Sequence, residues 1–143
     1  MLTMIPHNAD APLVEIPLFL SPAVCGFPSP AQDYVEQTID LNQLCVSHPA
    51  ATYYVRAKGN SMLGAGIHDG DLLIVDRSMR AVHGAVVIAS VDGEFTVKRL
   101  QLLPQPALLP ENDDYPPILL DDGSNAEMFG VVAFVVHSLK VTR

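Results

Sequence analysis

The sequence predicts a small, mostly β domain, either a barrel or a sandwich, with an extended N-terminal arm and one or two short helices. From residue 52 onward, short apolar runs alternate with Gly, Pro and Asp turn residues, which is typical of all-β domains. Residues 1–28 are proline-rich and have no strong periodicity, so we assign them to the arm and residues 29–143 to the β domain. The 143 residues are 49% hydrophobic, enough for one domain with its own core.

Two short helices are predicted between the arm and the first strand of the β domain. Ser29 is a candidate N-cap, Pro30 sits at the first helical position, and Gln32 completes a capping box. Asp40 repeats the capping signal, so we expect a second helix to begin directly after it. Pro49 ends the helical region, because the residue before a proline is disfavoured in the α conformation.

The strands of the β domain are predicted from apolar runs bounded by turn residues. Asp92-Gly93 is the strongest hairpin signal in the chain. If these two residues form the loop, Val87 lies opposite Lys98 on neighbouring antiparallel strands. Strands are expected at residues 52–56, 72–75, 85–90, 94–100, 106–110, 117–120 and 127–137.

The charge distribution argues against direct nucleic-acid binding and against membrane insertion. The net charge is −8, and residues 1–55 contain no Lys or Arg, whereas binding to a phosphate backbone requires clustered basic side chains. The same region lacks the basic start of a secretory signal. Residues 16–32 carry no charge, but four prolines within them oppose a spanning helix. We therefore expect a cytoplasmic protein with no membrane contact.

Neither the cysteines nor the histidines follow a metal-binding pattern. Cys25 and Cys45 are too few for a disulfide framework and lack metal-ligand spacing. No neighbour in the sequence would activate the Cys25 thiol as a nucleophile. The five histidines are scattered singly along the chain, so we expect no metal ion and no cofactor: His7, His48, His68, His83 and His137.

Ser61 and Lys98 are a candidate pair for peptidase chemistry without histidine. A serine hydroxyl is a weak nucleophile and needs a base, and a lysine amine can be that base if burial keeps it neutral near pH 7. Each residue also has an ordinary interpretation, as a turn serine and as a solvent-facing strand lysine. Thr96, Lys98 and Leu100 share one face of their strand, but the pattern does not say which face is buried.

Five ordered sequence blocks carry a family resemblance that favours the catalytic interpretation. The chain resembles the UmuD-type proteins of the bacterial SOS response, which are self-cleaving, LexA-like peptidases, over roughly residues 13–140. The resemblance implies a small LexA/signal-peptidase-like β fold, Ser61 as nucleophile and Lys98 as general base in an apolar cleft. The blocks are residues 25–30 (CGFPSP), 33–37 (DYVEQ), 59–62 (GNSM), 69–76 (DGDLLIVD) and 91–98 (VDGEFTVK).

The resemblance also implies a substrate, an activator and partners. Cleavage would fall between Cys25 and Gly26, and the backbone N–H groups of Asn60 and Ser61 would form the oxyanion hole. Gly26 suits a scissile position because it lacks a side chain, so its backbone can approach the serine closely. The activator would be the RecA–single-stranded DNA filament. The homodimeric, shortened form would join a UmuC-type Y-family polymerase in error-prone translesion synthesis.

Three other functions fit parts of the pattern. A LexA-type repressor needs a DNA-binding domain before the cleavage point, whereas only 24 residues, none of them basic, precede Cys25. A signal-peptidase-like enzyme shares the Ser/Lys chemistry but needs a membrane anchor. A non-enzymatic interaction module that regulates a DNA polymerase would not need to retain Ser61 and Lys98.

Overall fold

The computed structural model describes residues 4–6, 12–19, 25–26, 35–121 and 123–141, and it is mostly β, as predicted. The predicted strands from residue 52 onward are all present, with bounds within a residue or two of expectation. Ten strands are described: β1 (Met4–Pro6), β2 (Ile16–Phe19), β3 (Val35–Ile39), β4 (Thr52–Arg56), β5 (Leu72–Asp76), β6 (Val86–Val91), β7 (Glu94–Gln101), β8 (Ala107–Leu109), β9 (Ile118–Leu119) and β10 (Ala126–Val136).

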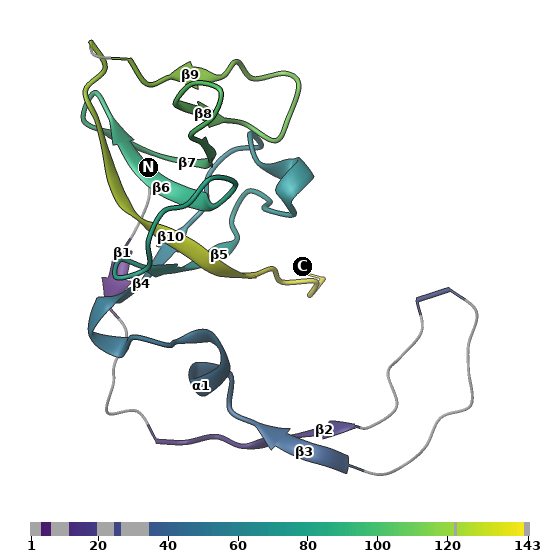
Figure 1. The fold of residues 1–143 in the computed structure, drawn as a ribbon. Helices are drawn as coiled ribbons and strands as arrows, with labels where there is room; N and C mark the ends of the chain where they lie inside the picture. The colour runs from purple at the N-terminus through teal and green to yellow at the C-terminus, as the bar shows by residue number, and fades with distance from the viewer. Residues whose placement is uncertain (1–3, 7–11, 20–24, 27–34, 122, 142–143) are drawn as a thin grey trace.

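Eight of these strands form one antiparallel sheet in the order β1-β4-β5-β10-β6-β7-β8-β9 (Figure 1). The long strand β10 joins the two halves of the sheet, because it pairs with β5 along one part and with β6 along another. Its register shifts at Met128/Gly130 and at Val132/Phe134, and such bulges bend a strand. The sheet therefore curls into a sandwich-like body without closing into a barrel, since β1 and β9 end the strand order.

The β6–β7 hairpin has the predicted register, with Val91 opposite Glu94 and Val87 opposite Lys98. Asp92 and Gly93 form its loop with φ angles of 51° and 84°. Two consecutive positive φ angles define the turn type that matches the twist of a β hairpin, and Asp-Gly is a preferred pair for it. Local turn chemistry therefore sets the position of Lys98 along the sheet.

Apolar side chains are buried on both faces of the sheet, in two clusters. On β6, Ile88 belongs to the first cluster and its neighbour Val87 to the second, because successive strand residues point to opposite faces. The first cluster also includes Met62 and Ile67, which come from the connection between β4 and β5. These two residues attach that connection, which carries Ser61, to the core.

The helix predicted after Asp40 is present as α1 (Leu41–Cys45). Its cap is the expected one, since the Asp40 carboxylate accepts hydrogen bonds from the backbone N–H groups of Asn42 at 2.8 Å and Gln43 at 3.2 Å. The start of the other predicted helix, at Ser29, lies outside the described residues. Two short 3₁₀ turns complete the helical elements of the described chain, η1 (Pro49–Ala51) and η2 (Leu63–Ala65).

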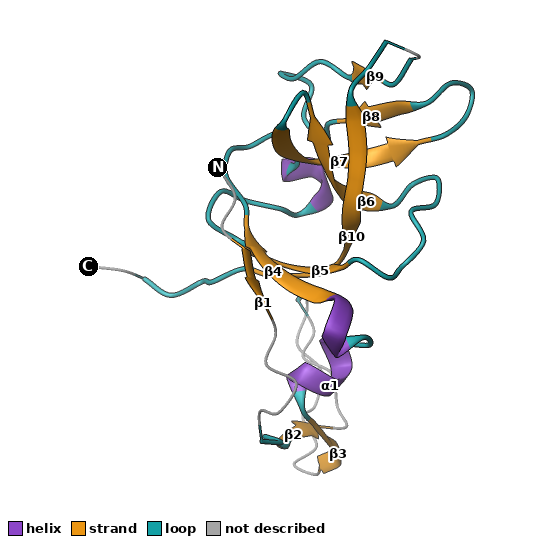
Figure 2. Ribbon diagram, turned by 90° about the vertical axis from the view of Figure 1, so that its left-hand side faces the viewer, coloured by secondary structure: helices purple, strands orange, loops and turns teal. Residues whose placement is uncertain are grey.

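The sequence did not predict the strands β1, β2 and β3. Only helices were expected between the arm and residue 52, whereas residues 35–39 form β3 and pair with β2. A capping signal indicates only the local preference of the backbone for a helix. The pairing of β2 with β3 joins segments about 20 residues apart, so a local signal cannot predict it. The arm boundary at residue 28 lies outside the described residues. Figure 2 shows β2, β3 and α1 at one end of the molecule, apart from the large sheet.

Within the described part of the chain, no helix has the length and apolar character that a bilayer crossing requires.

Candidate active site

Folding brings Ser61 and Lys98, 37 residues apart in sequence, into direct contact. Lys98 Nζ lies 3.0 Å from Ser61 Oγ. Lys98 is in the middle of β7 and is buried, with 8% of its surface exposed. Ser61 is in the connection between β4 and η2 and is half-buried. The ordinary interpretation of Lys98 as a solvent-facing strand lysine is therefore wrong.

The Lys98 amine has three oxygen neighbours, and this arrangement can accommodate its neutral form. Besides Ser61 Oγ, Nζ lies 2.8 Å from Thr96 Oγ1 and 3.1 Å from the Val97 carbonyl oxygen. A neutral amine has two N–H groups and one lone pair. The two N–H groups can be donated to Thr96 and Val97, which leaves the lone pair facing the Ser61 hydroxyl.

The electrostatic surroundings of Lys98 favour the same form. Burial lowers its pKa below the usual lysine value of 10.5, because desolvation penalises the ammonium. Among the described residues, no carboxylate forms an ion pair with it. A neutral amine in this position can accept the proton of the Ser61 hydroxyl.

The loop that carries Ser61 is held by a segment about 50 residues further along the chain. The backbone N–H of Glu111 donates to the Ser61 carbonyl oxygen at 2.8 Å, and the Glu111 carbonyl oxygen accepts from the N–H of Gly64 at 2.8 Å. The Asn112 side chain donates to the Asn60 carbonyl oxygen at 2.8 Å. Sequence reasoning missed Glu111, Asn112 and Gly64, because no local signal relates them to Ser61.

Glu111 also connects the serine loop to the strand that carries the lysine. Its carboxylate forms an ion pair with the Nε group of Arg99, the residue after Lys98. Arg99 is fixed further by a hydrogen bond of 2.6 Å from its guanidinium to the Gly84 carbonyl oxygen. The segment around Glu111 therefore binds both the loop of Ser61 and the strand of Lys98, which limits the movement of these two residues relative to each other.

A cleft of about 260 Å³ opens over this contact. Phe95 and Tyr115 contribute aromatic surface to it, so an extended apolar peptide could be held beside Ser61. Within the described residues, the N–H groups of Asn60 and Ser61 donate to no other group of the chain. The cleft is lined by residues 57–62, Ile67, residues 95–98 and Tyr115.

The expected cleavage point is outside this cleft. Cys25 and Gly26 are exposed and are not among the residues that line it. Figure 1 shows this short segment well away from the large sheet. The structure thus brings Ser61 and Lys98 together, with Asn60 beside them, and leaves Cys25-Gly26 apart.

Two of the histidines that are scattered in the sequence meet in the structure. His68 and His137 both lie against the buried carboxylate of Asp71. The prediction that the histidines are isolated is therefore wrong for this pair, because β10 returns the chain to the start of β5. The spacing of these residues in the sequence could not predict this contact, since 66 residues separate Asp71 from His137.

Comparison with known proteins identifies the family of this site. A model of the S24-like peptidases matches residues 17–133, which include Ser61, Lys98 and the segment around Glu111. The chain belongs to the S24-like peptidase family.

S24-like relatives match most of the length of this chain, and the match also covers most of the length of each relative. The protein MucA of Salmonella typhimurium is 50% identical over 126 residues, 87% of this chain and 84% of that protein. The protein ImpA of Shigella flexneri is 52% identical over 127 residues, 89% of this chain and 87% of that protein. The protein SamA of Salmonella typhimurium strain LT2 is 45% identical over 142 residues, 99% of both chains. This S24-like peptidase is thus UmuD-like over nearly its whole length.

Proposed function

We propose that this S24-like peptidase cleaves its own chain once, between Cys25 and Gly26, with Ser61 as nucleophile and Lys98 as general base. The observation that carries the proposal is the 3.0 Å contact between Ser61 Oγ and a buried lysine amine that has no counter-ion among the described residues. This geometry lies within the reach expected of a nucleophile and its base.

The reaction would proceed through an acyl-enzyme. Ser61 Oγ attacks the carbonyl carbon of Cys25 while Lys98 takes the hydroxyl proton, and the N–H groups of Asn60 and Ser61 stabilise the oxyanion. As the C–N bond breaks, Lys98 returns the proton to the leaving amine of Gly26. Water, deprotonated by Lys98, then hydrolyses the ester between Ser61 and Cys25.

Docking of the arm would control this reaction. The 36 residues from Cys25 to Ser61 can span on the order of 100 Å when extended, so reach within one chain or across a dimer is ample. The exposed position of Cys25-Gly26 fits an enzyme at rest, in which an activator need only favour the docked arrangement. We assign this activating role to the RecA–single-stranded DNA filament.

The cellular role proposed is SOS mutagenesis, through a homodimer whose shortened form works with a UmuC-type Y-family polymerase. The similarity to MucA, ImpA and SamA over most of the chain supports this role. The absence of Lys and Arg from residues 1–55 supports action through protein partners without direct DNA contact. Several exposed apolar side chains near β2 and on α1 would suit burial against a second copy: Leu13, Val14, Ile16, Leu41 and Leu44.

The position of the cleavage point outside the cleft is also compatible with a second candidate function, a non-cleaving interaction module. An interaction module that regulates a polymerase without cleaving itself would need no contact between Cys25-Gly26 and the cleft, which matches the arrangement described above. The two candidates differ in whether the chain changes mass when it is activated.

Intact mass spectrometry is the direct test of self-cleavage. The purified protein is incubated with RecA, single-stranded DNA and a nucleotide, in parallel with Ser61→Ala. We expect a new species that begins at Gly26 in the natural chain and none in the variant, because alanine lacks the attacking oxygen. A constant mass for the natural chain, also at raised pH without RecA, would favour the interaction module.

Thr96→Val is expected to slow self-cleavage by about tenfold at the high-pH plateau of the rate, because it removes a hydrogen-bond partner that positions the lysine amine. Valine matches threonine in shape, so the effect on folding should be small. The rate is measured against pH, and its inflection should move to lower pH, since the ammonium loses an acceptor that stabilised it. Thr96→Ser restores the hydroxyl and should restore both rate and inflection; an unchanged profile in Thr96→Val would exclude this positioning role.

A further inference from the structure

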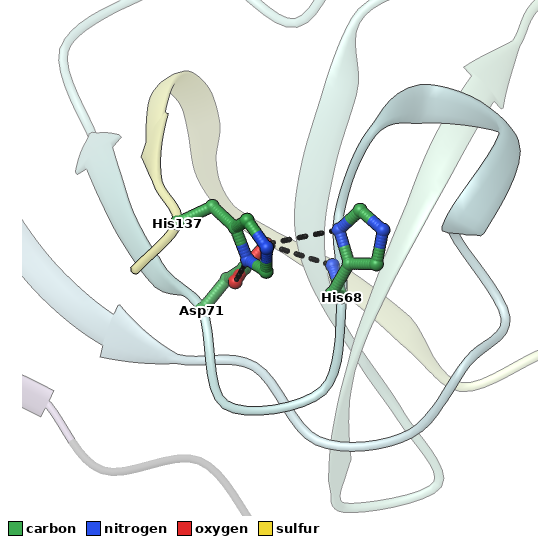
Figure 3. Close-up of side chains that lie close together, drawn as sticks. All are labelled: His68, Asp71 and His137. Carbon is green, nitrogen blue, oxygen red and sulfur yellow. Dashed lines mark hydrogen bonds and ion pairs between the residues drawn. The ribbon is translucent and has the colours of Figure 1, made fainter. Parts of the chain in front are cut away.

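The buried carboxylate of Asp71 lies between two imidazole rings (Figure 3). Its Oδ1 is 2.5 Å from His137 Nδ1, and its Oδ2 is 3.7 Å from His68 Nδ1. The two rings lie almost side by side, with their centroids 4.5 Å apart. One ligand atom from each of the three residues falls within 4.8 Å of the others. Two nitrogen atoms and one oxygen atom that can ligate a metal are therefore close to one another.

The three residues differ in how exposed they are. The Asp71 side chain is 2% exposed and is fixed by the backbone N–H of His68, which donates to Oδ2 at 2.8 Å. The histidine side chains are 50% and 40% exposed, so an ion can reach them from solvent.

The donor set is typical of zinc. Two imidazoles and one carboxylate, with water in the open position, form a common zinc coordination, whereas calcium and magnesium prefer oxygen ligands. In a tetrahedral site with bonds of about 2.0–2.1 Å, ligand atoms lie about 3.3 Å apart. To reach that value, the 2.5 Å contact between His137 Nδ1 and Asp71 Oδ1 would lengthen, and the 3.7 Å separation between His68 Nδ1 and Asp71 Oδ2 would shorten slightly.

An ordinary histidine–carboxylate pair elsewhere in the chain shows what is different here. Asp76 is buried and pairs with His48 Nδ1 at 2.6 Å, and its other oxygen accepts from Ser78. Both carboxylates accept a backbone N–H from their own turn, and both pair with one histidine ring. Asp71 differs because it has a second imidazole, that of His68, beside it.

We propose that His68, Asp71 and His137 form a zinc-binding site. The ion would join the residue that follows β10 to the turn that precedes β5, and so fasten the C-terminal end of β10 to the connection that also carries Ser61. Zinc that binds only the folded chain stabilises it, so zinc should raise the melting temperature, by an amount that grows with the logarithm of its concentration relative to Kd. This site is separate from the Ser61–Lys98 contact and does not depend on the peptidase proposal.

Cobalt(II) is the spectroscopic probe for this site, and untagged full-length protein is titrated with it. We expect one equivalent per chain with the visible bands of a tetrahedral ion, and displacement by zinc. Each of His68→Ala and His137→Ala should weaken cobalt binding by at least about tenfold, since loss of even a group that only supports a metal ligand costs that much. His48→Ala is the matched control, because it removes one histidine from the Asp76 pair and should bind cobalt normally.

The melting temperature supplies a second readout that does not rely on colour. Excess zinc should raise it in the natural chain and in His48→Ala, and should leave it unchanged in both His68→Ala and His137→Ala. Absence of cobalt binding to the natural chain would overturn the proposal. So would binding that survives both histidine substitutions, or a sulfur-to-cobalt absorption band, which would assign the metal to Cys25 or Cys45.

Discussion

Lys98→Met is expected to slow self-cleavage by about 10²- to 10⁴-fold, the usual contribution of a general base. Methionine has nearly the volume of the lysine stem and no amine, so the core around β7 should remain packed. The Ser61 hydroxyl would keep its place but lose the group that takes its proton. The rate is followed by intact mass in the presence of the RecA filament, and separately at alkaline pH without it.

If the neutral Lys98 amine is the base, the rate of self-cleavage should increase with pH. The base is the neutral amine, and its population rises with pH until the pKa of Lys98 is passed. Because burial lowers that pKa, the logarithm of the rate should rise by about one per pH unit below the pKa of Lys98 and level off above it, at a pH lower than 10.5. Lys98→Met should lose this rise, so its residual rate should be nearly flat over the same range.

Two further variants separate the base from a general effect of positive charge. Lys98→Arg keeps a cation but remains protonated throughout, so it should be as slow as Lys98→Met. Lys140→Ala removes an exposed lysine near the C-terminal end and should cleave at the natural rate. Cleavage by Lys98→Met with an unaltered rate and pH profile would contradict the assignment of Lys98 as base.

Gly64→Ala is expected to reduce the rate of self-cleavage by on the order of 100-fold, although residue 64 is not among the residues that line the cleft. A Cβ atom on Gly64 would lie 2.8 Å from the Glu111 carbonyl oxygen, which is closer than such atoms approach. That oxygen belongs to the backbone, so it cannot rotate away. Either η2 or the Glu111 segment must shift, and Glu111 holds the Ser61 carbonyl oxygen from its other side.

The size of the effect follows from how strictly the serine must be placed. A displacement of about 1 Å at a reacting group can cost about 100-fold in rate. Overpacking of this kind also costs about 1–3 kcal/mol of stability, so thermal melts should show a folded but less stable protein. Gly123→Ala is the control, because a Cβ there meets only the Asp121 carboxylate at 3.5 Å. A natural rate in Gly64→Ala would show that the Glu111 contact does not position Ser61.

The amino-acid sequence by itself determined the strands of the β domain and the register of the β6–β7 hairpin. Both depend on neighbours in the chain: apolar alternation for the strands, and the positive φ angles that Asp92-Gly93 readily adopts for the loop. The Asp40 cap of α1 is equally local. Family resemblance added the pairing of Ser61 with Lys98 as an expectation, which spacing alone could not supply.

Only the tertiary structure decided which face of β7 is buried, and therefore that the Lys98 amine is desolvated beside Ser61. It also decided that residues 35–39 form β3 by pairing with β2, that Glu111 holds the serine loop, and that His68 and His137 both lie against Asp71. Each of these contacts joins segments that lie far apart in the chain. Their energy comes from burial and long-range hydrogen bonds, and local sequence patterns carry no information about either.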